Sequence, residues 1–375
     1  MTISITQLGV VFPGGVGHQA LLEVLGQGRC LLRPSGLDPE LFAARIEADL
    51  KALVARRGLT SLSRSALLAA GAIEDLVRSV PSLLPEKSPG ECALVVGTAF
   101  GHVESKAQFH RVAREEGVRL VSPILFPNTI INSLAGHAAI LFGLEGPNST
   151  VASGRRSGLE AVVRAEGLLR ASRAARAIAV GSEEVSQALL RALSTARARP
   201  VCPGEAAVAF LLETGRQSRS LATIQGSGEA TTVGRGPYQA VIEAMQSALA
   251  EAGISRREVT FATLSAGGGL PDVDRAEVRA VRELLGEEMP CFAPKAIFGE
   301  TYGAGGALAL AAASLAAGAG LFPPTPGDSP ILRELVALGA TRTSPLRLRA
   351  EGSRVIVNAV DEEGATSIVV APTLP

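Results

Sequence analysis

The residues best placed to carry chemistry form the short segment Ser153–Gly158 (SGRRSG), between a strand-like run and a helix-like run. A strand-to-helix elbow suits a nucleophile, because the dipole at the helix N-terminus lowers the pKa of a cysteine placed there. The central residue here is Arg155, and a guanidinium stays protonated and has no usable lone pair. Ser153 or Ser157 would need a base, yet no histidine follows His137 in the chain. We therefore expect both serines to be structural.

Two further segments carry ionisable side chains close together in the sequence. SAGGGLPDVDRAE places Asp274 and Glu277 one helical turn apart, after a glycine-rich turn. PKAIFGETYGAGG carries Lys295 and Glu300. The glycine run Gly267–Gly269 follows a strand but lacks the spacing of a phosphate-binding loop or of a dinucleotide fingerprint. The glycine run therefore does not indicate a nucleotide-binding site.

Strands alternate with helices along the chain, which is typical of layered α/β architecture. The elbow is held by an expected strand at Ser149–Ser153 and an expected helix at Arg156–Ala171. Other strands are expected at Ile3–Val11, Cys92–Thr98, Ala177–Gly181, Ala206–Glu213, Ala222–Gly226 and Thr260–Ser265, with a closing antiparallel pair at Arg354–Ala359 and Thr366–Ala371. Other helices are expected at Gly17–Leu25, Ser63–Val80, Thr129–Phe142, Pro237–Ala252, Asp274–Leu285 and Ala304–Ala317. The similar order of elements in the two halves indicates an internal duplication.

Two segments between these elements are expected on the surface. The charged stretch Ala43–Gly58 is predicted to be a surface helix. Leu321–Pro330 contains four prolines and is predicted to be an exposed, rigid connection.

Composition excludes several classes of function. Lys and Arg number 36 and Asp and Glu also 36, so no net charge draws the chain to nucleic acid or to an anionic membrane. The four cysteines form no CxxC pair, and no histidine has metal-ligand spacing, so we expect free thiols, no metal and no cofactor. The N-terminal residues do not read as a signal peptide, and the Ala-rich run Gly303–Leu321 fits a buried helix better than a membrane span. We expect a cytoplasmic protein with no membrane partner.

Motifs spread over most of the chain resemble those of the β-ketoacyl-ACP synthases. GVVFPGG resembles their first strand and turn, and VSPILFPNTIINSLAGHAAILFGLEGPNSTVASGRRSG resembles the segment that leads into their nucleophile. CPGEAAVAFLLE is similar to a strand of the family, and PKAIFGETYGAGGALAL to its KSxxGHxxGAAG block. The resemblance implies the thiolase-type α/β fold, with two similar αβ halves in an α/β/α/β/α layered arrangement. The halves are expected at 1–214 and 215–375.

The same resemblance locates the family's catalytic positions. The nucleophilic cysteine corresponds to Arg155, and the two histidines correspond to Ala266 and Glu300. Lys295 is retained, either to order the site or as a structural ion-pair partner. The glycine-rich gating loop with its phenylalanine corresponds to Val360–Gly364, which has no aromatic residue. The resemblance therefore implies that the chain has no catalytic residue and is a ketosynthase-like pseudoenzyme.

A buried arginine at the elbow needs a compensating charge, because an unpaired cation in the interior is costly. The implied fold brings the position of Glu300 beside that of Arg155. We therefore predict an Arg155–Glu300 ion pair, joined by Asp361 or Glu362, that fills the former active site. The alternative is that Arg155 points to solvent through a widened entrance.

The implied function resembles that of the chain-length factor of type II polyketide synthases. Such a subunit forms a heterodimer with an active β-ketoacyl-ACP synthase, meets acyl carrier protein through that complex, and closes the acyl tunnel in polyketide or polyene biosynthesis. The segment that resembles the family's partner-facing region supplies the candidate tunnel or interface residues Phe126, Ile130, Asn132, Ser133, Leu134 and His137.

Two other functions stay open on the sequence. The chain could be a homodimeric binding protein for acyl chains or for acyl carrier protein, since this needs only a maintained fold and pocket. It could also be a malonyl-ACP decarboxylase. Related decarboxylases keep both histidines, however, so Ala266 and Glu300 disfavour this second alternative.

Overall fold

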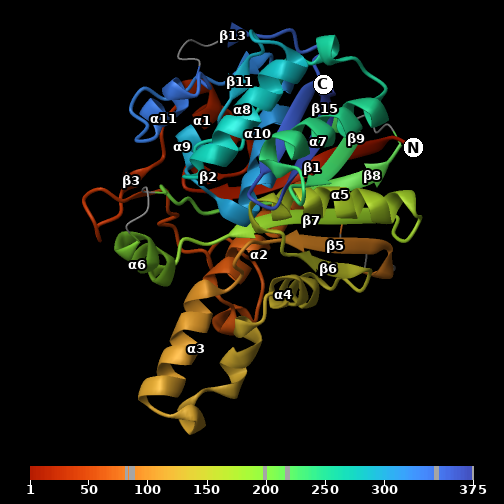
Figure 1. The fold of residues 1–375 in the computed structure, drawn as a ribbon. Coiled ribbons are helices and arrows are strands. Elements are labelled where there is room, and N and C mark those ends of the chain that lie inside the picture. Colours follow the sequence, from red (N-terminus) through yellow and green to blue (C-terminus); the bar gives the residue numbers. More distant parts are fainter. Residues whose placement is uncertain (81–82, 84–88, 197–200, 216–219, 342–345, 374–375) are drawn as a thin grey trace.

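The same five-stranded arrangement occurs twice in the chain (Figure 1). In the first half, β6 (Asn148–Val151), β5 (Cys92–Gly97), β7 (Arg176–Glu183), β8 (Ala206–Thr214) and β1 (Ile3–Phe12) lie side by side in that order. In the second half the order is β11 (Cys291–Phe292), β10 (Phe261–Thr263), β14 (Val355–Val360), β15 (Gly364–Pro372) and β9 (Ala222–Thr231). With the strands of each half numbered along the chain, both orders are 3-2-4-5-1. This computed structural model describes all residues except 81–82, 84–88, 197–200, 216–219, 342–345 and 374–375.

Strand directions repeat as well. In each half the second strand runs parallel to the third and fourth, whereas the fifth is antiparallel to both the fourth and the first. Antiparallel pairing of Ile3–Ile5 in β1 with Ala222–Ile224 in β9 joins the two arrangements. The duplication that the residues alone only suggested is therefore visible in the topology.

Helices form three layers around these strands (Figure 1). Helices α2 (Arg64–Ser79) and α4 (Ser133–Phe142) cover the outer face of the first half, and α7 (Gly236–Ala252) and α8 (Pro271–Leu285) cover the second. Between the halves lie α5 (Ser157–Arg170) and α10 (Gly305–Gly318). Helix α10 carries apolar residues on all sides, which fits its almost complete burial between the two halves. The predicted α/β/α/β/α layering is confirmed.

Shorter elements complete the chain. The remaining helices are α1 (His18–Gln27), α3 (Val103–Glu115), α6 (Gln187–Thr195), α9 (Lys295–Phe298) and α11 (Leu332–Ala337). Two-residue strands are β2 (Gly15–Val16), β3 (Arg33–Pro34), β4 (Phe42–Ala43), β12 (Leu321–Phe322) and β13 (Leu346–Arg347). The 3-10 turns are η1 (Leu59–Ser61), η3 (Pro89–Glu91), η4 (Val118–Leu120), η5 (Pro123–Thr129), η6 (Gly154–Arg156), η7 (Arg256–Glu258) and η8 (Tyr302–Ala304).

Two surface predictions are wrong. Ala43–Gly58 contains no helix: its chain follows the body of the protein and buries Ile46, Leu50 and Val54. Tertiary hydrogen bonds to residues 203–205 replace helical ones there, which local charge patterning does not reveal. Leu321–Pro330 is not an exposed connection either, because about half of it is buried, including Phe322.

A projection formed by α3, η4 and η5 stands out from the layered body (Figure 1). Helix α3 has no buried residue, and it was not predicted. The predicted helix Thr129–Phe142 begins only at Ser133, because the proline-containing stretch before it folds as η5. The projection and the adjoining face of α4 carry the exposed apolar side chains Val118, Leu120, Ile124, Leu125, Phe126, Ile130 and Ile140. We call this set the apolar patch.

Two predictions from composition can be compared with the structure. All four cysteines are free thiols, as predicted. Burial raises the pKa of Cys92 and of Cys202 to about 11, so neither is a reactive thiolate at neutral pH. Among the described residues, no single helix is long and apolar enough to cross a membrane, although η5 and α4 together meet the length and composition test across a 110° bend.

Close contact between α5 and α10 depends on glycine. A Cβ atom at Gly158 would lie 2.5 Å from the carbonyl oxygen of Gly303 and 3.1 Å from the Cβ of Ala307. Gly167 on the same helix is exposed and has open space around it. Helix packing therefore requires glycine at position 158 but not at position 167.

We expect Gly158→Ala to lower the free energy of unfolding by about 1–3 kcal/mol, because the added methyl forces two backbones apart. Gly167→Ala should raise it by about 0.5–1 kcal/mol through helix propensity. Urea denaturation of both variants tests this. Equal effects at the two positions would contradict the packing argument.

Candidate functional site

The predicted elbow is present between β6 and α5, where η6 turns the chain. Gly154 has a φ of 61°, and a Cβ there would approach Asp361 Oδ2 to 2.9 Å, so this turn requires glycine. The hydroxyl of Ser157 accepts a hydrogen bond from Ser153 N–H (2.9 Å) and donates one to the Gly154 carbonyl (2.7 Å). Ser157 is completely buried. Its hydroxyl therefore holds the turn and is not available as a nucleophile.

Arg155 points inward from this turn. Its Nη1 lies 3.2 Å from Glu300 Oε2, and its Nη2 donates to the Gly268 carbonyl at 2.8 Å. Lys295 Nζ lies 2.8 Å from the same Glu300 oxygen. The Glu300 side chain is 1% exposed and that of Arg155 is 15% exposed. The predicted Arg155–Glu300 pair is confirmed, and the alternative of a solvent-directed arginine is wrong.

Burial alone would raise the pKa of Glu300. The positive charges of Arg155 and Lys295 outweigh that effect, however, and hold the pKa below its ordinary value. The other Glu300 oxygen accepts a hydrogen bond from Tyr302 N–H at 2.7 Å. Glu300 is thus an ionised carboxylate that compensates two buried cations.

The two carboxyls of the DxxE pattern lie close to this cluster. Burial raises the pKa of Asp274 to about 6 and that of Glu277 to about 8. Asp274 Oδ2 accepts a hydrogen bond from Gly267 N–H (3.1 Å), and Glu277 Oε1 accepts one from Ser265 N–H (2.8 Å). Both carboxyls therefore hold the glycine-rich turn that carries Ala266, which is itself completely buried.

Little space remains around the cluster. A cavity of about 20 Å³ is lined by Arg155, Lys295, Glu300 and Tyr302, together with apolar residues of α9 and α10. This is room for about one water molecule. The side chains of the cluster are therefore closely packed.

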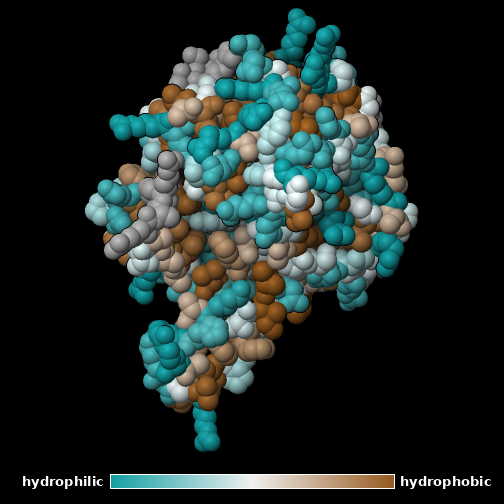
Figure 2. Space-filling view, viewed as in Figure 1, coloured by the Kyte–Doolittle hydropathy of each residue, from teal (hydrophilic) through white to brown (hydrophobic). Residues whose placement is uncertain are grey.

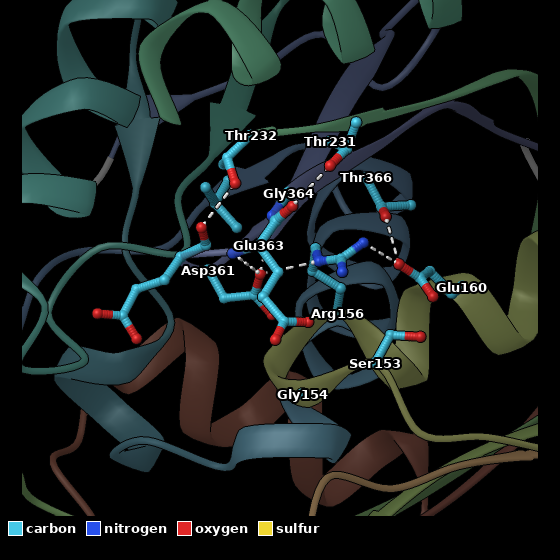
Figure 3. Close-up of polar contacts among 12 residues, drawn as sticks. Ser153, Gly154, Arg156, Glu160, Thr231, Thr232, Asp361, Glu363, Gly364 and Thr366 are labelled. Atoms are coloured by element: carbon cyan, nitrogen blue, oxygen red, sulfur yellow. Dashed lines mark hydrogen bonds and ion pairs between the residues drawn. The ribbon is translucent and has the colours of Figure 1, made fainter. Parts of the chain in front are cut away.

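Arg156 makes a second link between the halves of the chain (Figure 3). Its Nε donates to Asp361 Oδ1 at 2.9 Å, and its Nη1 pairs with Glu160 of α5. The same Asp361 oxygen accepts hydrogen bonds from Glu363 N–H and Gly364 N–H. The prediction that Asp361 or Glu362 joins Arg155 is wrong, because Asp361 pairs with the neighbouring arginine and Glu362 is exposed.

The predicted interface residues differ in how exposed their side chains are. Phe126 and Ile130 are exposed members of the apolar patch, Asn132 is exposed, and Ser133 and His137 are half-buried. The prediction that Leu134 faces a tunnel or an interface is wrong, because its side chain is completely buried in the core of its own chain. Ala135 beside it is buried in the same core, so this side of the first turn of α4 faces inward.

A buried histidine that the sequence did not single out joins three helices at the base of the projection. His102 Nδ1 lies 2.9 Å from the Ser65 hydroxyl, near the start of α2, and also contacts Ser63. Its Nε2 lies 2.7 Å from the hydroxyl of Ser133, the first residue of α4. Burial lowers the pKa of His102 to about 3, so the ring is neutral and too weak a base to activate Ser133 at neutral pH. We assign it a structural role.

Comparison with known proteins agrees with this geometry. The model of the beta-ketoacyl synthase N-terminal domain matches residues 1–217, and that of the C-terminal domain matches 220–327. The chain therefore belongs to the beta-ketoacyl synthase family.

Similar proteins include polyketide beta-ketoacyl synthases and 3-oxoacyl-[acyl-carrier-protein] synthases. It is 26% identical to a putative polyketide beta-ketoacyl synthase 1 of Streptomyces virginiae, over 86% of this chain and 87% of the relative. It is 25% identical to the actinorhodin polyketide putative beta-ketoacyl synthase 2 of Streptomyces coelicolor, over 92% and 94%. The structure of the ishigamide ketosynthase/chain length factor matches it with a TM-score of 0.80 and 25% identity over the whole of both chains.

A double-mutant cycle tests the charge cluster. Glu300→Gln should destabilise the protein more than Arg155→Met, because it leaves two buried cations without compensation. The double variant should lose less stability than the sum of the single losses, with a coupling of about 1 kcal/mol or more. Denaturant unfolding measures all four forms.

The surface pair Asp272–Arg275 is the matched control, since its side chains are 89% and 61% exposed. Asp272→Asn and Arg275→Met should show almost no coupling. Strictly additive losses at Arg155 and Glu300 would refute the cluster.

His102 predicts a pH dependence of stability. Its pKa is lower in the folded protein than in the unfolded chain, so the unfolded state binds the proton first as pH falls. The contribution is fully present above about pH 6.5 and is lost as pH falls toward 3. Between pH 7 and pH 5 the loss from this group should be about 2 kcal/mol.

His102→Asn should therefore flatten the stability profile over this interval by that amount, measured by urea unfolding at both pH values. His110→Asn, at an exposed position of α3, should leave the profile unchanged. An identical slope in His102→Asn and the parent would show that this ring does not titrate as described.

Proposed function

We propose that this chain is a non-catalytic ketosynthase-like subunit, a chain-length factor, that pairs with an active β-ketoacyl-ACP synthase in polyketide or polyene biosynthesis. The observation that carries the proposal is the charge cluster of Arg155, Lys295 and Glu300 in the position of the family's active site. This cluster of two cations and one carboxylate offers no nucleophile, and the cavity beside it measures only about 20 Å³. The fold remains intact around it, which favours a structural role in a complex.

The local chemistry disfavours decarboxylation as well. Decarboxylation of a malonyl group needs donors that stabilise the developing enolate. Ala266 offers no side-chain donor, and the ionised Glu300 would repel the malonyl carboxylate. Lys295 and Arg155 are already engaged by Glu300. The malonyl-ACP decarboxylase is therefore the weaker alternative.

A partner of the same family would fit the edge of the first half. β6 is the outermost strand of its sheet, and its other edge has no strand beside it among the described residues. The hydroxyls of Ser149 and Thr150 on this strand are enclosed and have no hydrogen-bond partner within the described chain. Open strand edges favour pairing with another chain.

Most of the apolar patch lies on the projection, where Figure 2 shows hydrophobic side chains among hydrophilic ones, and α4, which carries the rest, packs against β6. Ile124 is 74% exposed and Phe126 is 52% exposed. Such a gathering of exposed apolar side chains marks an interaction surface. The similar ishigamide protein is named as a ketosynthase/chain length factor, which supports a ketosynthase as the partner.

The tunnel role rests on the same segment. Phe126, Ile130 and Asn132 are exposed and His137 is half-buried, so a partner that covers this segment would contact them. The Ser133 hydroxyl is already bonded to His102 and to the Ile130 carbonyl, so this residue would shape the tunnel through its backbone and bulk. A homodimeric acyl-binding or carrier-protein-binding protein is the second candidate, because the edge strand and the patch would also suit a second copy.

The deciding experiment is to purify the tagged chain from its native host and to measure the mass of the intact complex. We expect a one-to-one complex with a ketosynthase that keeps the cysteine and both histidines, and condensing activity only in that complex. A homodimer without a ketosynthase would overturn the proposal in favour of the acyl-binding alternative.

Ile124→Asp should weaken this complex about 100-fold or more, because an unpaired carboxylate would be buried at the contact. Val233→Asp is the matched control, since Val233 is 79% exposed but lies outside the apolar patch. Titration of the labelled partner with each variant gives the dissociation constants. Equal weakening by both variants would remove the patch from the interface.

A further inference from the structure

A cleft separate from the charge cluster has arginines on its walls. Its volume is about 750 Å³, which lies within the range of small-molecule sites. The walls are the β1–β2 turn, the segment that follows α1, and the chain after β4. Phe12, Pro13, Leu31 and Ile46 contribute apolar surface to it.

Three arginines line the cleft: Arg29, Arg33 and Arg45. Glu47 is the one acidic residue among the lining residues. Within the described part of the chain, none of the three guanidinium groups forms an ion pair with a carboxylate. The cleft therefore has an excess of positive charge in a protein whose total charge is balanced.

Arg45 is the residue that points to a ligand. Its Nε atom is enclosed and has no hydrogen-bond acceptor among the described residues. Because Nε itself is enclosed, a ligand in the cleft can reach only the outer guanidinium nitrogens of this half-buried side chain. The charge of Arg45 is likewise uncompensated, and an anion against the outer guanidinium nitrogens would neutralise it.

The backbone on both sides of Arg45 is held in place. Ala44 N–H donates to the Pro203 carbonyl (2.9 Å), and the Ala44 carbonyl accepts from Glu205 N–H (3.0 Å). Ile46 N–H donates to the completely buried carboxylate of Glu205 at 2.6 Å. Arg45 is therefore presented from a rigid segment, and a rigid site loses less entropy when a ligand binds.

Arg33 is oriented as well. Its Nη1 donates to the carbonyls of Cys30 (3.0 Å) and Leu32 (2.8 Å), which fixes the guanidinium plane and leaves its other nitrogens without a partner among the described residues. A guanidinium fork recognises phosphate and carboxylate oxygens in bidentate fashion. Apolar walls beside the arginines favour a ligand that also has a hydrocarbon part.

From these observations we propose that the cleft between the β1–β2 turn and residues 43–48 binds a small molecule with an oxyanion headgroup, a phosphate ester or a carboxylate, joined to an apolar portion. The proposal is independent of the chain-length-factor function. Failure of either leaves the other standing.

Calorimetric titration of the purified chain with hexyl phosphate, hexanoate and inorganic phosphate tests the site at low salt. We expect saturable binding of hexyl phosphate or of hexanoate with a dissociation constant of about 1 mM or tighter. The tighter of the two identifies the headgroup, and weaker binding of inorganic phosphate would show that the apolar wall contributes. Absence of saturable heat with all three probes overturns the proposal.

Arg45→Met should weaken this binding at least tenfold, whereas Arg45→Lys should retain part of it, because a lysine keeps the charge but loses the fork. Arg114→Met is the control, since Arg114 is 81% exposed on the projection and far from the cleft in sequence. Unchanged melting temperatures would show that the variants are folded. Equal binding by Arg45→Met and the parent would refute the site.

Discussion

The structure depends on one buried carboxylate. Glu300 compensates Arg155 from the first half of the chain and Lys295 from the second. Two cations in the interior are tolerable only because this carboxylate is ionised and further held by a backbone N–H. The cluster closes the space around it and ties the elbow to the glycine-rich turn through the Gly268 carbonyl. It is a structural joint between the two halves of the chain.

The neighbouring arginine extends the joint. Arg156 links the same elbow to Asp361 in the turn between β14 and β15, so two consecutive residues fasten one turn to two loops of the other half. Glycine contacts between α5 and α10 bring the halves close enough for these side chains to reach. Packing and electrostatics therefore support each other: the close approach makes the ion pairs possible, and the ion pairs hold the loops.

Exposed features lie mainly away from this joint. The projection carries apolar side chains on a helix and turns that have little core of their own, and neutral His102 fastens its base to α2 and α4. An exposed apolar patch of this kind is typical of a surface that another molecule covers. The arginine-lined cleft likewise has a feature, unpaired positive charge, that a bound molecule would compensate.

The sequence by itself determined the family fold, the elbow and the pairing of Arg155 with Glu300, because motif order and the cost of an isolated buried cation are both readable from residues. It also located most helices and strands by their apolar periodicity. Only the tertiary structure decided that Asp361 pairs with Arg156 rather than Arg155, that Leu134 faces inward, and that Ala43–Gly58 is not a helix. Each of these depends on contacts between residues distant in the chain, and local pattern carries no information about which of two adjacent side chains reaches a distant partner. The same limit applied to His102, whose three hydroxyl partners come from segments that only the fold brings together.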